Sequence, residues 1–69
     1  MEQDKPTESA LLFDAAKMAS KAVEANPSQA GRAKARSAWL KVAAALEAEG
    51  KPDTHLAVVN ARNHARMYK

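Results

Sequence analysis

The sequence has no cysteine and few large hydrophobic residues. Of its 69 residues, 32 are apolar, but 17 of these are alanine, and the only aromatic residues are one Phe, one Trp and one Tyr. No disulfide can form, which fits a reducing compartment. Each alanine buries little apolar area, although such burial is the main stabilising contribution to folding. We therefore expect a thin core that is completed by oligomerisation or by a partner.

Long apolar runs are also lacking. The longest extends over the five residues from Val42 to Leu46, whereas a helix that spans a membrane needs roughly 20. The first residues, Met-Glu-Gln-Asp-Lys-Pro, are acidic and lack the apolar segment of a secretory signal. These features predict a cytoplasmic protein without a membrane partner.

Glycine and proline are scarce, and they stand where helices would end. The alanine-rich stretches are interrupted only at Asn26-Pro27 and at Gly50-Lys51-Pro52. No alternating strand pattern competes with this reading. The sequence thus predicts an all-α domain over residues 1–69, a small three-helix bundle in which residues 1–5 are disordered. The expected helices lie near 7–25, 29–49 and 54–67.

Short polar residues support these bounds. The first helix is expected to start between Asp4 and Thr7, the second to be capped by Ser28 and the third by Asp53. At the other ends, Asn26 and Gly50 are expected to take the left-handed conformation that often follows a helix.

The periodicity of the first helix suggests which side is buried. Phe13 lies away from the apolar stripe, and it either covers the edge of a neighbouring helix or anchors a contact with another chain. The stripe itself, which we expect to face the core, consists of Leu11, Leu12, Ala15, Met18, Ala19, Ala22 and Val23.

The second helix has two apolar stripes. The stronger one, expected in the core, consists of Ala35, Trp39, Val42, Ala43 and Leu46. Nearly opposite lie Ala33, Ser37, Leu40, Ala44 and Ala48. This second stripe is either alanine used as a surface helix former or a subunit interface centred on Leu40.

The third helix is divided in the same way, and the sequence does not decide which side is the core. One side carries Ala57, Val58, Ala61, Ala65 and Tyr68. The other carries Leu56, Val59, Asn63 and Met67. Spare apolar faces on two successive helices favour a homo-oligomer.

Residues that could carry out catalysis do not converge in this sequence. His55 and His64 fall on opposite sides of the third helix, so they cannot share a metal within one chain. No hydroxyl residue has the setting of an activated nucleophile, and the two glycines form no phosphate-binding loop. We predict no catalytic residue, no metal site, no cofactor and no enzymatic activity. No motif identifies a family.

Positive charge is concentrated in the last two-thirds of the chain. Residues 1–27 carry a net charge of −2 and residues 28–69 a net charge of +5, which together give +3. Cations near the start of the second helix oppose its dipole but could bind a phosphate or carboxylate there. The alternatives are solubility and, in the third helix, dipole stabilisation. The candidate anion-binding residues are Arg32, Lys34, Arg36, Arg62 and Arg66.

These features predict a small non-enzymatic regulatory or adaptor protein that binds a protein partner through its helix faces. Phe13, Leu40 and Met67 are the expected apolar contacts. The alternative is a small basic nucleic-acid-binding protein that uses the positive surface of residues 32–41 and 55–69.

Overall fold

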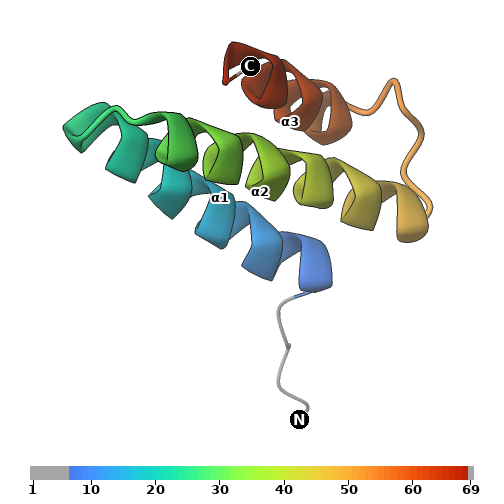
Figure 1. Ribbon diagram of the computed structural model, residues 1–69. Coiled ribbons are helices and arrows are strands. Elements are labelled where there is room, and N and C mark those ends of the chain that lie inside the picture. Colours follow the sequence, from blue (N-terminus) through green and yellow to red (C-terminus); the bar gives the residue numbers. More distant parts are fainter. Residues whose placement is uncertain (1–6, 69) are drawn as a thin grey trace, which may run out of the picture.

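The chain forms three α-helices, as the sequence predicts. The computed structural model describes residues 7–68, and no strand occurs among them. Helix α1 spans Glu8–Ala25, α2 spans Gln29–Ala48 and α3 spans Leu56–Met67 (Figure 1). The fold class, a small three-helix bundle, is confirmed. The expected disorder of residues 1–5 lies outside the described residues.

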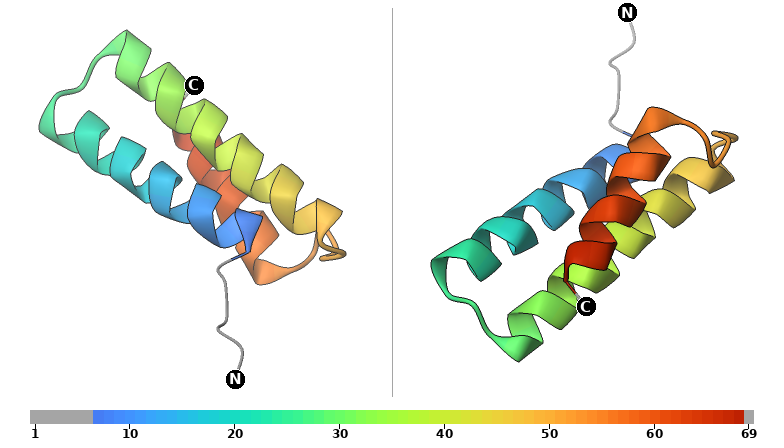
Figure 2. Two further views of the ribbon diagram at one scale, coloured as in Figure 1. Left: turned by 90° about the horizontal axis from the view of Figure 1, so that it is seen from below. Right: turned by 90° about the horizontal axis from the view of Figure 1, so that it is seen from above.

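Helix α2 is the central element of the fold. It runs back alongside α1, and α3 then returns over one side of α2 (Figures 1 and 2). Both α1 and α3 pack against α2, but no Cα atom of α1 lies within 8 Å of a Cα atom of α3. Among the described residues, no helix is long and apolar enough to cross a membrane.

The N-terminal ends of α1 and α2 are capped by hydroxyl side chains. Thr7 Oγ1 accepts a hydrogen bond from the backbone N–H of Ala10 at 3.2 Å. Ser28 Oγ accepts one from the N–H of Gly31 at 3.0 Å. Each bond satisfies an amide that has no partner within its helix. The expected cap at Ser28 is confirmed.

Glycine ends α2 as the sequence predicts. Gly50 has a φ of 95°, which a residue with a side chain rarely adopts. Its N–H donates to the carbonyl of Glu47, and the N–H of Lys51 donates to the carbonyl of Leu46, each at 3.0 Å. These two bonds form a Schellman motif, which satisfies the last carbonyl groups of the helix.

Two expected helix-end conformations are wrong. Asn26 has a φ of −148°, not a positive one, because the ring of Pro27 restricts the preceding residue to extended conformations. Asp53 does not cap α3. The N–H of His55 instead donates to the carbonyl of Pro52, closing a turn, and His55 Nδ1 accepts from the N–H of Ala57 at 3.1 Å. Helix α3 therefore begins at Leu56, later than expected.

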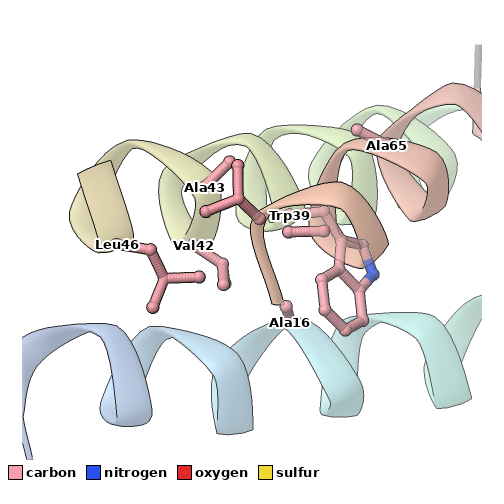
Figure 3. Close-up of a cluster of buried hydrophobic side chains, with 8 residues drawn as sticks. Ala16, Trp39, Val42, Ala43, Leu46 and Ala65 are labelled. Carbon is pink, nitrogen blue, oxygen red and sulfur yellow. The ribbon is translucent and has the colours of Figure 1, made fainter. Parts of the chain in front are cut away.

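The core lies where α2 faces the other two helices (Figure 3). The stronger stripe of α2 is buried in full, as predicted. On α3 the structure selects Val58, Ala61 and Ala65 for the core and leaves Leu56 and Met67 exposed. The core cluster consists of Ala16, Trp39, Val42, Ala43, Leu46, Val58, Ala61 and Ala65.

The predicted core face of α1 is correct only in part. Val23 is buried and Leu12 packs half-buried against the core, as expected, but the helix is rotated so that most of the rest of the stripe faces away from the core. Leu11 is 56% exposed and Met18 71% exposed, and the buried residues are Ser9, Ala16 and Val23. Polar contacts favour this rotation of the helix. The N–H and hydroxyl of Ser9 donate to the Glu49 carboxylate at 3.2 and 2.9 Å, near the beginning of α1.

A second polar contact holds the middle of α1. The indole Nε1–H of Trp39 donates to Ser20 Oγ at 2.8 Å. Because Trp39 is 3% exposed, an unpaired indole N–H would lose its hydrogen bond to water without replacement. This bond, together with a fully buried Ala16 beside the indole, gives a physical reason why a less apolar face of α1 is turned inward.

We expect Ser20→Ala to destabilise the fold. The change leaves the indole N–H without its partner, at a cost of about 1 kcal/mol. Ser37→Ala is the matched control, because Ser37 is an exposed serine in α2, and both changes raise helix propensity by a few tenths of a kcal/mol. In urea unfolding, the Ser20 variant should be the less stable of the two by about 1 kcal/mol. Equal stabilities would contradict the assigned hydrogen bond.

Candidate functional site

A hollow opens between the beginning of α1 and the beginning of α3. Its volume is about 280 Å³. Most of its lining is apolar, and all three helices contribute to it. The lining residues are Ser9, Ala10 and Phe13 of α1, Val42 and Leu46 of α2, and Ala57 and Asn60 of α3.

A second hollow, of about 430 Å³, continues from the first toward the end of α3. The two share Phe13 and Asn60, and the second adds Trp39, His64 and Met67 to the lining. We call the two hollows together the α1/α3 groove. The groove exists because α1 and α3 each pack on α2 but not closely on each other.

Three aromatic rings form the middle of the groove. The ring of Phe13 meets Trp39 edge to face, with the centroids 5.5 Å apart. The imidazole of His64, from α3, stacks on the indole of Trp39, with the ring centroids 4.2 Å apart. Lys17 Nζ lies 4.9 Å from the centroid of the Phe13 ring. Such contacts favour fixed ring orientations, so the groove has a preformed aromatic centre.

Phe13 covers the edge of a neighbouring helix, one of the two roles expected for it. It remains 41% exposed, so part of the ring is still free to meet a ligand. Met67 lines the same groove and is exposed. Leu40 does not join them, because it lies at the junction of α2 and α3. The structure thus brings two of the three predicted apolar contacts together.

Four of the five predicted basic residues meet along the junction of α2 and α3. One hollow, of about 220 Å³, is lined by Arg36, Leu40, Arg62, Ala65 and Arg66. An adjoining hollow, of about 550 Å³, shares Arg36 and adds Arg32 and Tyr68. Lys34 lies apart, beside Ala15 and Met18 at the junction of α1 and α2. We call Arg32, Arg36, Arg62 and Arg66 the arginine surface.

One residue of the arginine surface is paired. Arg62 forms a salt bridge with Glu47 of α2. Glu47 stands at the end of α2, where a negative charge opposes the helix dipole, and a cation from α3 therefore offsets it. Within residues 7–68, Arg32, Arg36 and Arg66 make no salt bridge. These three cations are available to an anionic ligand.

The residues of the groove floor were not predicted as site residues. The sequence predicts Trp39, Val42 and Leu46 to be in the core, and they do lie there, but they also line the groove. Only the correct orientation of α1 would have shown that this side of α2 is left partly uncovered. Within the described residues, no three acidic or histidine side chains gather closely enough to hold a metal ion.

We expect Phe13→Ala to open the groove around Trp39. Loss of the ring removes its edge-to-face contact, which is worth about 0.5–1.5 kcal/mol beyond burial alone, and exposes one side of the indole. Trp39 is the only tryptophan, so its fluorescence should shift to longer wavelength and acrylamide should quench it more strongly. Leu56→Ala, at an exposed residue outside the groove, should change neither property. An unchanged quenching constant for Phe13→Ala would refute the contact.

Three comparisons with known proteins bear on the identity of the chain. No protein-family model, no curated protein and no solved structure matches it. The function must therefore be argued from the chemistry of the α1/α3 groove and the arginine surface.

Proposed function

We propose that this protein is a non-enzymatic adaptor or regulatory protein that binds an amphipathic helix of a protein partner in the α1/α3 groove. The observation that carries the proposal is a mainly apolar groove with exposed side chains on its walls and aromatic rings at its centre. Cytoplasmic location, inferred from the absence of cysteine, is part of the proposal.

A groove of this kind can bind a helix if the two surfaces fit in shape and make apolar contacts. A partner helix buries residues spaced three and four apart between two flanking helices. Helix α3 has 12 residues and is about 18 Å long at 1.5 Å per residue, which suits three turns of a bound helix. Aromatic residues at the centre of an interface tend to contribute most of the binding energy, and Phe13 has that position.

A binding role also agrees with how the histidines are used. His55 caps α3. His64 Nδ1 lies 2.8 Å from the carbonyl oxygen of Asn60, within its own helix, and the ring stacks on Trp39. Both residues thus have structural contacts that account for them. This supports a role in binding over one in proton transfer.

Self-association belongs to the same proposal. Among the described residues, the largest side chains that are less than 2% exposed are those of Val42 and Val58. In the same part of the chain, seven large hydrophobic residues are exposed, on all three helices. Apolar surface of this extent favours contact with further protein.

The second candidate function is nucleic-acid binding. It is favoured by the arginine surface, in which two helices contribute a pair of arginines each, four residues apart. Arginine is well suited to phosphate because its planar guanidinium can donate two hydrogen bonds at once. In this case Leu40 and Tyr68 would contact the ligand beside the arginines.

A pull-down from lysate of the source cells tests the proposed groove. Met67→Glu and Ala10→Glu place a charge on the exposed lining, and they should abolish capture of a protein partner. Leu56→Glu, outside the groove, should not. The capture should survive nuclease treatment and differ little between 50 and 200 mM salt, since apolar burial is not screened. A partner captured equally by all three variants would contradict the groove.

The same experiment identifies the alternative. If four phosphates bind the arginine surface, affinity should fall about 10²-fold between 50 and 200 mM salt. Everything captured should then be lost on nuclease treatment and with the Arg36→Glu/Arg66→Glu variant. This result would replace the adaptor proposal with the nucleic-acid one.

A further inference from the structure

The outer face of α1 carries an exposed apolar stripe, which borders a hollow toward α2 where Lys34 lies beside it. Leu11, Ala15, Met18 and Ala22 follow one another in steps of four, three and four residues. All four are exposed, and Leu11 and Met18 keep more than half of their surface in water. The buried residues of α1, such as Ala16 and Val23, lie on the far side of the helix.

This spacing is that of the contact seam in a coiled coil. Residues alternating at three and four positions stay on one line along a helix when a second helix wraps around it. Two of the four residues on that line, Leu11 and Met18, are large and hydrophobic. The stripe thus has the form of a surface that binds a second, parallel or antiparallel, helix.

The stripe is complementary to itself when two copies run antiparallel. With Met18 of each copy opposite Ala15 of the other, Leu11 falls opposite Ala22 of the second copy. Every layer then contains one large side chain and one alanine. Such pairing lets two helices approach closely while filling the space between them. A parallel pair in register would instead place Leu11 against Leu11 and leave Ala15 against Ala15.

Charges beside the stripe agree with the antiparallel arrangement. Asp14 and Lys21 lie seven residues apart, on the same flank of the stripe. A two-fold axis perpendicular to both helices brings the same flank of each copy together, so that Asp14 meets Lys21 of the second copy. Charged residues on the flanks of a seam set the orientation of the two helices. Within residues 7–68 the one salt bridge of Asp14 is with Lys17 Nζ, at 3.8 Å and on the surface, a weak pair.

We propose that two copies of this chain form an antiparallel dimer through the outer faces of their α1 helices, with the two-fold axis between Ala15 and Met18. The inference rests on the proposed self-association and assigns a surface to it. The stripe that contains Leu40 is less suited to such a contact. Three arginines, Arg36, Arg62 and Arg66, flank Leu40. One lysine, Lys34, lies beside the α1 stripe, so a two-fold axis at Leu40 would bring more like charges together.

The oligomeric state of the full chain tests whether the apolar stripe of α1 forms the dimer contact, which we call the seam. Light scattering with size exclusion should give twice the 7.4 kDa mass of one chain, with dissociation on dilution. Met18→Glu should give the monomer mass with unchanged helicity by circular dichroism, since Met18 is largely exposed within one chain. Leu40→Glu is the matched control, a charge placed on another exposed helix face, and it should remain dimeric.

Charge exchange tests the antiparallel orientation. Asp14→Lys and Lys21→Asp should each weaken the dimer roughly tenfold or more, because each replaces two attractive contacts with two repulsive ones. A mixture of the two single variants should form a heterodimer, and the Asp14→Lys/Lys21→Asp double variant should dimerise as the wild type does.

The possible failures are distinguishable. A wild-type chain that stays monomeric at millimolar concentration would overturn both the seam and the proposed self-association, but not the groove. A dimer that survives Met18→Glu but is split by Leu40→Glu would overturn the seam and keep self-association. If the double variant is no better than the single ones, the antiparallel pairing is wrong.

Discussion

The single tryptophan determines how the three helices are arranged. Trp39 is almost fully buried, and three neighbours hold its indole in place. Ser20 accepts its N–H, Phe13 meets it edge to face, and His64 stacks on it. A buried indole has to satisfy both a large apolar surface and one donor, and α1 and α3 take the positions that do so.

Much of the exposed surface follows from that constraint. Ala16 is fully buried beside the indole (Figure 3), so the side of α1 that bears Leu11 and Met18 is turned toward solvent. The width of the indole, together with Phe13 and His64 on either side, also helps to keep α1 and α3 apart. The α1/α3 groove and the outer stripe of α1 are therefore two results of the same packing.

The positions of the helices could be predicted from the sequence more accurately than the contacts between them. The ends at Ser28 and Gly50 were predictable because a single side chain, or the lack of one, decides each. The buried side of α2 was predictable because Trp39, Val42 and Leu46 share one stripe. For α1, periodicity correctly placed Leu12 and Val23 toward the core but wrongly added Leu11 and Met18, because counting apolar residues gives no weight to the polar partners that Trp39 and Glu49 require.

The grouping of the candidate binding residues also depends on helix contacts that the sequence does not reveal. Arginines four residues apart within one helix could be grouped from the sequence, but their meeting across the junction of α2 and α3 depends on the path of the chain between Gly50 and His55. Lys34 is close to Arg32 and Arg36 in the sequence but not in space. It lies at the junction with α1, because residues two positions apart in a helix do not share a face.

The central claim is that Trp39 holds α1 by the face that carries Ser20 and Phe13. Nuclear Overhauser contacts of the indole protons test this directly, because they report neighbours within a few ångströms. The account predicts cross-peaks from the indole N–H to the side chain of Ser20 and from the indole ring to Phe13 and His64. Strong cross-peaks from the indole to the methyl groups of Leu11 or Met18 would contradict it, since they would place the opposite side of α1 in the core.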